Sequence, residues 1–247
     1  MARLTILRLS TSHTNLIQNR CNIFTMKSIK FIFFLIITVS YSQNKNVFED
    51  EYIKLWNKEL PLSFDDFNGN LDKNPKVKIY ADSTGRHLIS TIEIYKVIDV
   101  YSNKKKEWKP DVIYLCPSFE KANSFLIQKD KDLLKNQQLI FDYAELTCRR
   151  IRNDLKDIAD EQTSTIGKNT AQTLMLNHVF VEYYNEFIQT KKAFIKEYYE
   201  SNNKEAYNLM RKVINEELEK TTELATRIND CKRFYLDKPI KKEYVRK

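Results

Sequence analysis

Apolar and polar residues alternate along the first half of the chain, the pattern of strands that bury one face. The alternation begins at Val77, Ile79 and Ala81 and continues to Tyr101. A further short apolar run ends at Pro117, which cannot donate a hydrogen bond to a neighbouring strand. We therefore expect about four strands in this half, mostly antiparallel.

The second half instead carries apolar residues at intervals of three, four or seven, the spacing of helices with one buried face. Three long helices are expected, over residues 131–160, 170–199 and 204–233. The apolar face of the first consists of Leu133, Ile140, Ala144, Cys148, Ile151, Leu155 and Ile158, and that of the second of Leu174, Val181, Tyr184, Phe187, Ile188 and Ile195. Strands followed by helices predict an α+β fold.

A short apolar run near the beginning predicts export. Two lysines follow Met26, residues 31–39 are apolar except for Thr38, and the small residues Ser40 and Ser42 precede Gln43. These are the three regions of a cleavable signal peptide, so the mature chain is expected to begin at Gln43. The run is too short to cross a bilayer, which needs about 20 residues, and no cysteine follows it to carry a lipid. No stable membrane anchor is expected.

The signal peptide would occupy residues 26–42, and residues 43–247 would form a single domain. Residues 1–25 hold three arginines and no acidic residue, and we interpret them as a gene-model extension before the true start. Removing residues 1–42 removes five basic residues and lowers the formal net charge from +8 to +3. The remaining charges are interspersed, and the lysine run at 104–106 is expected at a hairpin tip. We therefore predict no nucleic-acid partner.

Cysteine and histidine are sparse in the predicted mature chain. Cys116, Cys148 and Cys231 permit one disulfide in an oxidising compartment, and the sequence leaves all three pairings open. Cys148 lies on the apolar helical face, where a small buried side chain is expected. His87 and His178 are isolated, so each is expected to be a satisfied core or boundary residue rather than a metal ligand.

Residues 133–152 carry the most informative motif, Leu-Leu-Lys-Asn-Gln-Gln-Leu-Ile-Phe-Asp-Tyr-Ala-Glu-Leu-Thr-Cys-Arg-Arg-Ile-Arg. This segment resembles a family of bacterial secreted proteins of unknown function that are predicted to be zinc-dependent proteases. The family's helix typically reads Leu-Leu-Lys-His-Glu-Gln-x-His-Phe-Asp-x-Ala-Glu-x-x-Ala-Arg-x-x-Arg. The positions in register are Leu133, Leu134, Lys135, Gln138, Phe141, Asp142, Ala144, Glu145, Arg149 and Arg152.

Weaker matches extend the resemblance to about residues 52–155. Residues 62–69 resemble the family's Leu-Thr-Trp-x-Asp-Phe-x-Gly segment. Matches outside the helix also include Ala81, Thr84, Phe119, Ser124 and Phe125. The resemblance implies secretion and a zincin-like fold, a small sheet followed by helices.

The chain departs from this family where zinc would bind. Two histidines four residues apart on a helix present both imidazoles to one metal, and the glutamate between them activates the bound water. Here those positions hold Asn136, Gln137 and Ile140. The family's downstream Thr-x-His-Gly aligns with residues 226–229, which contain no histidine. We therefore expect a vestigial site with no catalytic residue, no metal and no cofactor.

These observations favour an exported, catalytically inactive homologue that binds or scaffolds in the cell envelope, periplasmic or secreted. Its unknown protein or peptide partner would contact the former cleft or a tyrosine-rich surface, formed by Tyr183, Tyr184, Tyr198 and Tyr199. A purely structural role in the envelope fits the sequence equally well. The alternative is a hydrolase with a rebuilt, non-standard metal site at Asp142, Glu145 and His178. We favour a protein that is not an enzyme, in which Asp142, Glu145, Arg149 and Arg152 hold the helix in place.

Overall fold

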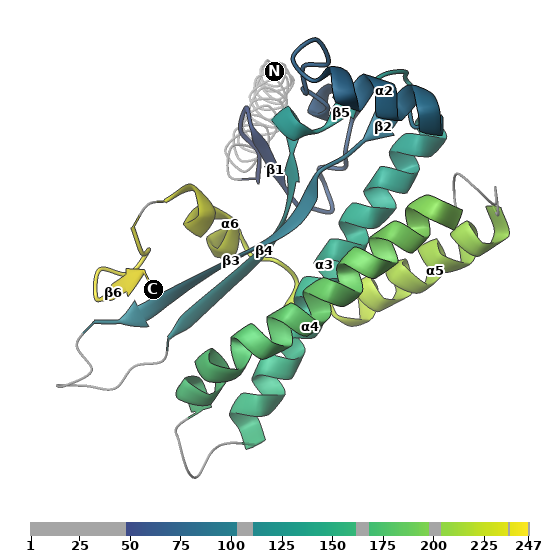
Figure 1. Ribbon diagram of the computed structural model, residues 1–247. Helices are drawn as coiled ribbons and strands as arrows, with labels where there is room; N and C mark the ends of the chain where they lie inside the picture. Colours follow the sequence, from purple (N-terminus) through teal and green to yellow (C-terminus); the bar gives the residue numbers. More distant parts are fainter. Residues whose placement is uncertain (1–47, 103–110, 162–167, 198–203, 237, 247) are drawn as a thin grey trace, which may run out of the picture. The chain divides into compact units, whose positions relative to one another are not determined.

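The computed structural model in Figure 1 describes residues 48–102, 111–161, 168–197, 204–236 and 238–246. For residues 159–161 and 168–174 it describes the backbone alone. The chain divides into two units, Met1–Asn46 and Val47–Lys247, and every described residue belongs to the second. The predicted leader, the lysine run at 104–106, and Tyr198 and Tyr199 lie outside the described residues.

Two antiparallel sheets occupy the described part of the chain. The larger has the strand order β1-β4-β3-β6 and the smaller pairs β2 with β5. The strands are β1 (Ile53–Leu55), β2 (Leu88–Ile89), β3 (Ile92–Tyr101), β4 (Val112–Glu120), β5 (Phe125–Leu126) and β6 (Tyr244–Arg246). Two of these, β3 and β4, are much longer than the others and form the centre of the larger sheet.

Helices make up most of the remainder, so the fold is α+β, as predicted. The α-helices are α2 (Pro75–Thr84), α3 (Lys131–Glu161), α4 (Lys168–Lys196), α5 (Lys204–Lys220) and α6 (Ile228–Tyr235). Short 3₁₀ turns are η1 (Phe64–Asp66), η2 (Lys121–Asn123) and η4 (Thr222–Leu224). Within the described ranges, no helix combines the length and apolar composition needed to cross a bilayer.

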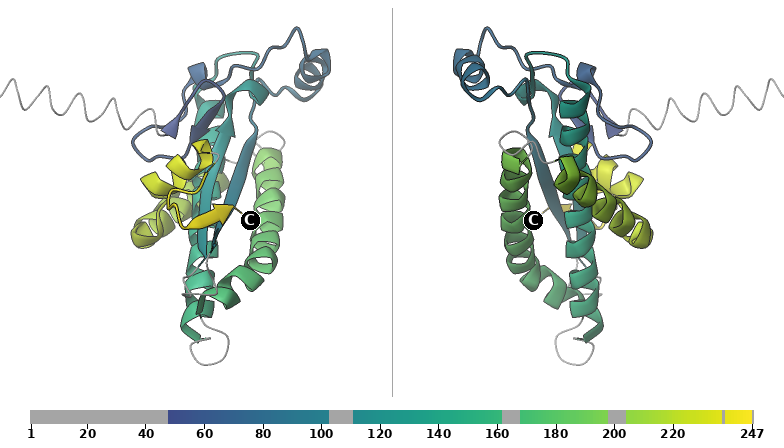
Figure 2. Two further views of the ribbon diagram at one scale, coloured as in Figure 1. Left: turned by 90° about the vertical axis from the view of Figure 1, so that its left-hand side faces the viewer. Right: turned by 90° about the vertical axis from the view of Figure 1, so that its right-hand side faces the viewer.

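The larger sheet is covered on both faces. Leu115 and its neighbour Cys116 point to opposite faces of β4, and they belong to two separate hydrophobic clusters. On the side of Leu115, α3 packs against the sheet, and α4 and α5 pack on α3. On the side of Cys116, α6 packs against β3 and β4. Figure 2 shows α6 and α4 on opposite sides of the β3–β4 hairpin.

The buried face predicted for α3 is confirmed. Ile140, Ala144, Cys148 and Ile151 are all fully buried in the larger cluster. The prediction for α4 was only partly right, because Phe187 is buried but Val181 is 53% exposed. Leu176 and Val179 nearby are buried, so the inward face of α4 passes beside Val181, whose side chain faces solvent.

The first predicted strand was wrong. Val77, Ile79 and Ala81 lie in helix α2, which begins with Pro75 in its first turn and ends at Gly85. Proline fits the first turn of a helix, and Gly85 adopts a positive φ of 66° at the C-cap, where glycine carries no steric penalty. Ala81 is buried while Ile79 is 68% exposed, so the alternation does not mark a buried strand face.

Pro117 does not end its strand, contrary to our prediction. Strand β4 continues through it to Glu120. The Trp56 N–H donates to the Pro117 carbonyl (3.1 Å), so the backbone polar groups of Pro117 face β1. Since Trp56 lies just beyond the last residue of β1, the missing N–H of Pro117 costs one bond at the end of that ladder.

The third predicted helix is broken. It ends at Lys220, and a separate helix, α6, begins at Ile228. Arginines of α3 bind the last turn of α5 and the segment after it: Arg149 Nη1 donates to the Leu218 carbonyl (2.5 Å) and Arg152 Nη1 to the Leu224 carbonyl (2.8 Å). Because these carbonyls are bound from outside, they need no partner within a continuous helix.

The structure selects one cysteine pair from the three that the sequence allows. Cys116 Sγ and Cys231 Sγ lie 3.6 Å apart and are fully buried, whereas Cys148 lies in the other hydrophobic cluster. We predict that chain recovered from an oxidising compartment carries a Cys116–Cys231 disulfide. It would form by thiol–disulfide exchange, in which the disulfide of an oxidoreductase takes up the two electrons and two protons and becomes a dithiol.

Intact-mass measurement after alkylation in denaturant, without reductant, tests this pairing. We expect one alkylated cysteine per mature chain, identified as Cys148. After the mass of the alkyl group is subtracted, the chain should be lighter than the fully reduced, unmodified chain by two hydrogen atoms. The Cys148→Ser variant should then show no alkylation. A crosslink that includes Cys148, or three alkylated cysteines in oxidised material, would contradict the pairing.

Candidate functional site

The positions that would hold zinc in the resembling family lie inside the protein. Asn136 and Ile140 are fully buried on α3, and Gln137 is 3% exposed. Ile140 packs in the larger hydrophobic cluster, as its place on the apolar face predicted. A substrate therefore has no access from solvent to these three side chains.

The residues at these positions do not fit a zinc ion. Gln137 accepts a hydrogen bond from the Ser90 hydroxyl, and Ile140 has only hydrocarbon to offer. Asn136 differs from Gln137, because neither polar atom of its buried side chain has a hydrogen-bond partner among the described residues. A neutral amide is nevertheless a poor zinc ligand, since structural and catalytic zinc sites use imidazole, thiolate or carboxylate.

Asp142, one residue of the alternative metal site, is occupied by structural contacts. Its Oδ1 accepts hydrogen bonds from Trp56 Nε1 (2.9 Å) and Gln138 Nε2 (2.8 Å). Burial raises the pKa of Asp142, and these two hydrogen bonds oppose that shift. The carboxylate thus ties the segment before η1 to helix α3.

Glu145 is also committed to structure. It is fully buried, and its Oε1 accepts from Arg149 Nε (2.8 Å) and from the Thr226 N–H (2.9 Å). The Thr226 hydroxyl donates to the other carboxylate oxygen. Arg152 Nη2 reaches the Leu115 carbonyl (2.6 Å), so these family-matching charged residues join α3 to the sheet and to the segment after α5.

His178 does not join the other two residues of the alternative site. Its side chain is 73% exposed on α4 and lies 3.8 Å from Glu182, so our prediction of a core or boundary position was wrong. His87 precedes β2 and is half-buried. Across the described ranges, no group of three or more His, Cys, Asp or Glu residues is arranged to hold a metal ion.

No family model, no curated protein and no solved structure matches this chain. The resemblance to secreted zinc proteases therefore rests on the sequence motif alone. What the chain can bind must be argued from its own surface.

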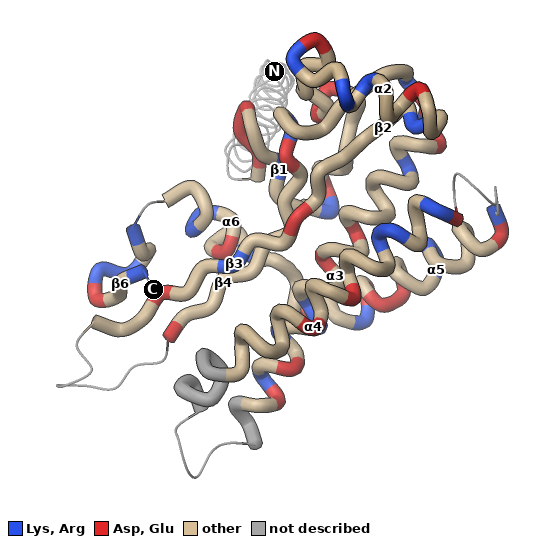
Figure 3. Tube along the Cα trace, viewed as in Figure 1, with Lys and Arg blue, Asp and Glu red and all other residues tan. Residues whose placement is uncertain are grey.

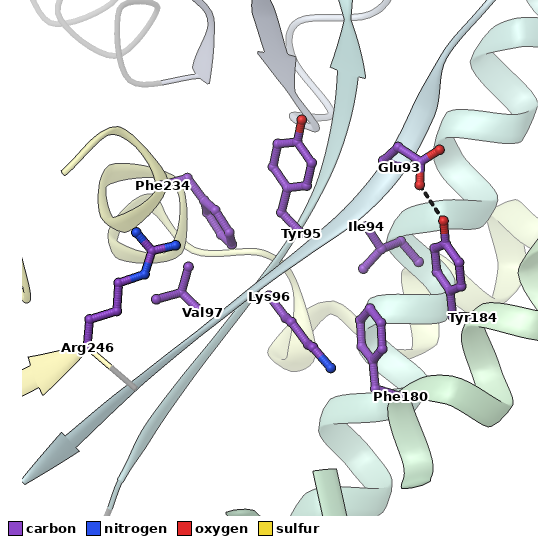
Figure 4. Close-up of a pocket in the computed structure, with 9 residues that line it drawn as sticks. All are labelled: Glu93, Ile94, Tyr95, Lys96, Val97, Phe180, Tyr184, Phe234 and Arg246. Carbon is purple, nitrogen blue, oxygen red and sulfur yellow. Dashed lines mark hydrogen bonds between the residues drawn. The ribbon is translucent and has the colours of Figure 1, made fainter. Parts of the chain in front are cut away.

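A groove lies along strand β3, and Figure 4 shows its lining. Its volume is about 460 Å³. The floor is formed by residues 93–97 of β3, and the walls come from Phe180 and Tyr184 of α4 on one side and from Phe234 and Arg246 on the other. The groove thus opens between α4 on one side and α6 with β6 on the other.

Polar contacts fix the α4 side of the groove. The Tyr184 hydroxyl donates to Glu93, and burial together with this hydrogen bond raises the pKa of Tyr184 to about 12. Lys96 Nζ lies 4.2 Å from the centre of the Phe180 ring and donates to Asn177 Oδ1 (3.0 Å). Burial lowers the pKa of Lys96, which indicates a partly desolvated cation beside an aromatic surface.

Sequence reasoning identified only one wall residue of this groove, Tyr184. Its neighbour Tyr183 instead donates to Asp154 of α3 (2.7 Å), so only one of the two tyrosines lines the groove. Phe234 and Arg246 follow Lys96 by more than a hundred residues, and no local pattern links them.

Figure 3 shows acidic and basic residues interspersed along α3, α4 and α5.

Proposed function

We propose that this chain is an exported binding or scaffolding protein of the cell envelope that has no peptidase activity. The observation that carries the proposal is the burial of Asn136, Gln137 and Ile140, which leaves no accessible site where a protease of the resembling family would have one. The open groove along β3 offers an accessible surface for a partner instead. Asp142 and Glu145 hold the scaffold together through hydrogen bonds and carry no chemistry.

The test is metal content together with hydrolysis. We expect purified protein to hold no stoichiometric zinc, because an amide and an isoleucine cannot replace two imidazoles. We also expect casein and mixed fluorogenic peptides to remain uncleaved when zinc is added. Elemental analysis that finds one tightly held zinc per chain would overturn the proposal, as would peptide cleavage that rises in proportion to the amount of purified chain.

A further inference from the structure

One edge of strand β3 directs backbone polar groups into the groove. Hydrogen bonding alternates along an antiparallel pair, and a residue not bonded to its opposite partner points its N–H and C=O outward. Pro117 faces β1, as its bond from Trp56 shows, and it lies opposite Ile94 in the register of β3 and β4. Ile94, and Lys96 two residues later, therefore direct their N–H and C=O away from β4.

Contacts at both ends of this edge support the assignment. Ile92 lies two residues before Ile94, so its N–H and C=O point in the same direction. Its carbonyl accepts a hydrogen bond from Lys191 Nζ of α4 (3.2 Å). At the other end, the Ser102 N–H also points away from β4 and donates to the Glu243 carbonyl (3.0 Å), next to the pairing of β3 with β6. Between these contacts, no strand within the described ranges pairs with this edge of Ile94 and Lys96.

The two walls fit the alternating side chains of an added strand. Successive residues of a strand point to opposite faces, so one set would meet Phe180 and Tyr184 and the other would meet Phe234 and Arg246. Both walls contain aromatic residues. A cation lies at each side of the groove, Lys96 of the floor beside the α4 wall and Arg246 in the other wall. The acidic residue of the lining, Glu93, is already bonded to Tyr184.

We propose that the β3 edge binds an extended acidic peptide, which adds to the sheet as an antiparallel strand beside Ile94 and Lys96. The backbone groups of the edge supply hydrogen bonds. One set of alternate side chains is acidic and pairs with Lys96 on the α4 side, and the other set is apolar and packs against Phe234. This inference rests on the proposed binding function and names the class of partner.

A fluorescein-labelled Glu-Val-Glu-Val-Glu-Val peptide is the probe, and fluorescence polarisation with the full chain is the measurement. We expect saturable binding that weakens with salt, and little binding of the matched Lys-Val peptide. Two further Glu-Val peptides carry N-methyl groups on alternate amides, in complementary positions. Only one set of amides faces β3 in an added strand, so one of these peptides should bind and the other should not.

Two substitutions at Lys96 distinguish the contribution of its backbone N–H to peptide binding from that of its side-chain charge. Lys96→Met keeps the outward N–H and removes the charge, so it should reduce the salt dependence. Lys96→Pro also removes the N–H, which takes no part in the β4 ladder, and should weaken binding by about tenfold more. Circular dichroism checks that both variants fold. The N-methyl pair gives the same information with the unaltered chain if Lys96→Pro does not fold.

Several results would overturn the inference. Equal binding of both N-methylated peptides would exclude strand addition, and binding of the Lys-Val peptide alone would reverse the charge assignment. Dimerisation of the chain that Lys96→Pro abolishes would identify a second copy as the occupant. Absence of peptide binding would end this proposal but leave the non-catalytic function standing, whereas cleavage of the probe would overturn the proposed function itself.

Discussion

Replacing Arg233 with methionine is expected to destabilise the fold by about 3–5 kcal/mol, the usual cost of removing one partner from a buried ion pair. Arg233 and Asp99 are each 1% exposed. Arg233 Nε and Nη2 donate to the two carboxylate oxygens of Asp99, both at 2.7 Å, and Nη1 donates to the Leu236 carbonyl (2.6 Å). The variant would leave the Asp99 charge buried without its partner.

Chemical denaturation measures this loss, and two comparisons make it specific. The double variant Asp99→Leu with Arg233→Met should recover a large part of the stability, because no lone charge then remains. Lys58→Met removes an exposed ion pair with Glu219 and should cause no measurable change. If Arg233→Met unfolds at the same denaturant concentration as the parent, α6 is not fastened to β3 by this pair.

Ile140→His is expected to cost about 2–5 kcal/mol, by analogy with other losses of buried packing. The imidazole would replace a fully buried side chain in the larger hydrophobic cluster. Burial disfavours the charged form and holds the folded-state pKa of the new histidine below its unfolded value of about 6.5. The variant should therefore lose further stability as the pH falls from about 7 to 5.

Thermal melting tests this prediction, with Val181→His as the matched control at an exposed position. The control should melt close to the parent. The triple variant Asn136→His, Gln137→Glu, Ile140→His should recover part of its loss when zinc is added, because zinc would bind the folded state. It should still lack useful peptidase activity, since no third ligand is supplied. An Ile140→His variant that melts like the parent would contradict the buried position of residue 140.

The spacing of apolar residues predicted correctly which face of a long helix is buried. The prediction for α3 was correct because apolar residues recur every three or four positions along the buried face of a long helix. The same reasoning failed at Ile79, where Pro75 and Gly85 at the helix ends outweighed an apparent alternation. It failed again between Lys220 and Ile228, because the arginines that bind this segment belong to α3 and are about 70 residues away in the sequence.

The apolar face of α3 predicted the burial of Ile140 correctly, whereas the vestigial zinc site stays a prediction. The groove could not be predicted in the same way. Its parts come from β3, α4, α6 and β6, and how much of the β3 edge away from β4 stays open depends on pairing with residues near 245. A free strand edge leaves no mark in the local pattern, since strands at the centre and the edge of a sheet share the same period.

The late position of α6 and β6 in the chain affects when folding can finish. Asp99 and Arg233 are separated by 134 residues, and β6 pairs with β3 from still further along. During synthesis, β3, β4 and α3 emerge well before the elements that cover their second face. A polypeptide secreted in an unfolded state must stay unfolded until it has crossed the membrane. Placing α6 and β6 last delays cooperative folding until almost the entire chain is free, which would suit the export that we propose.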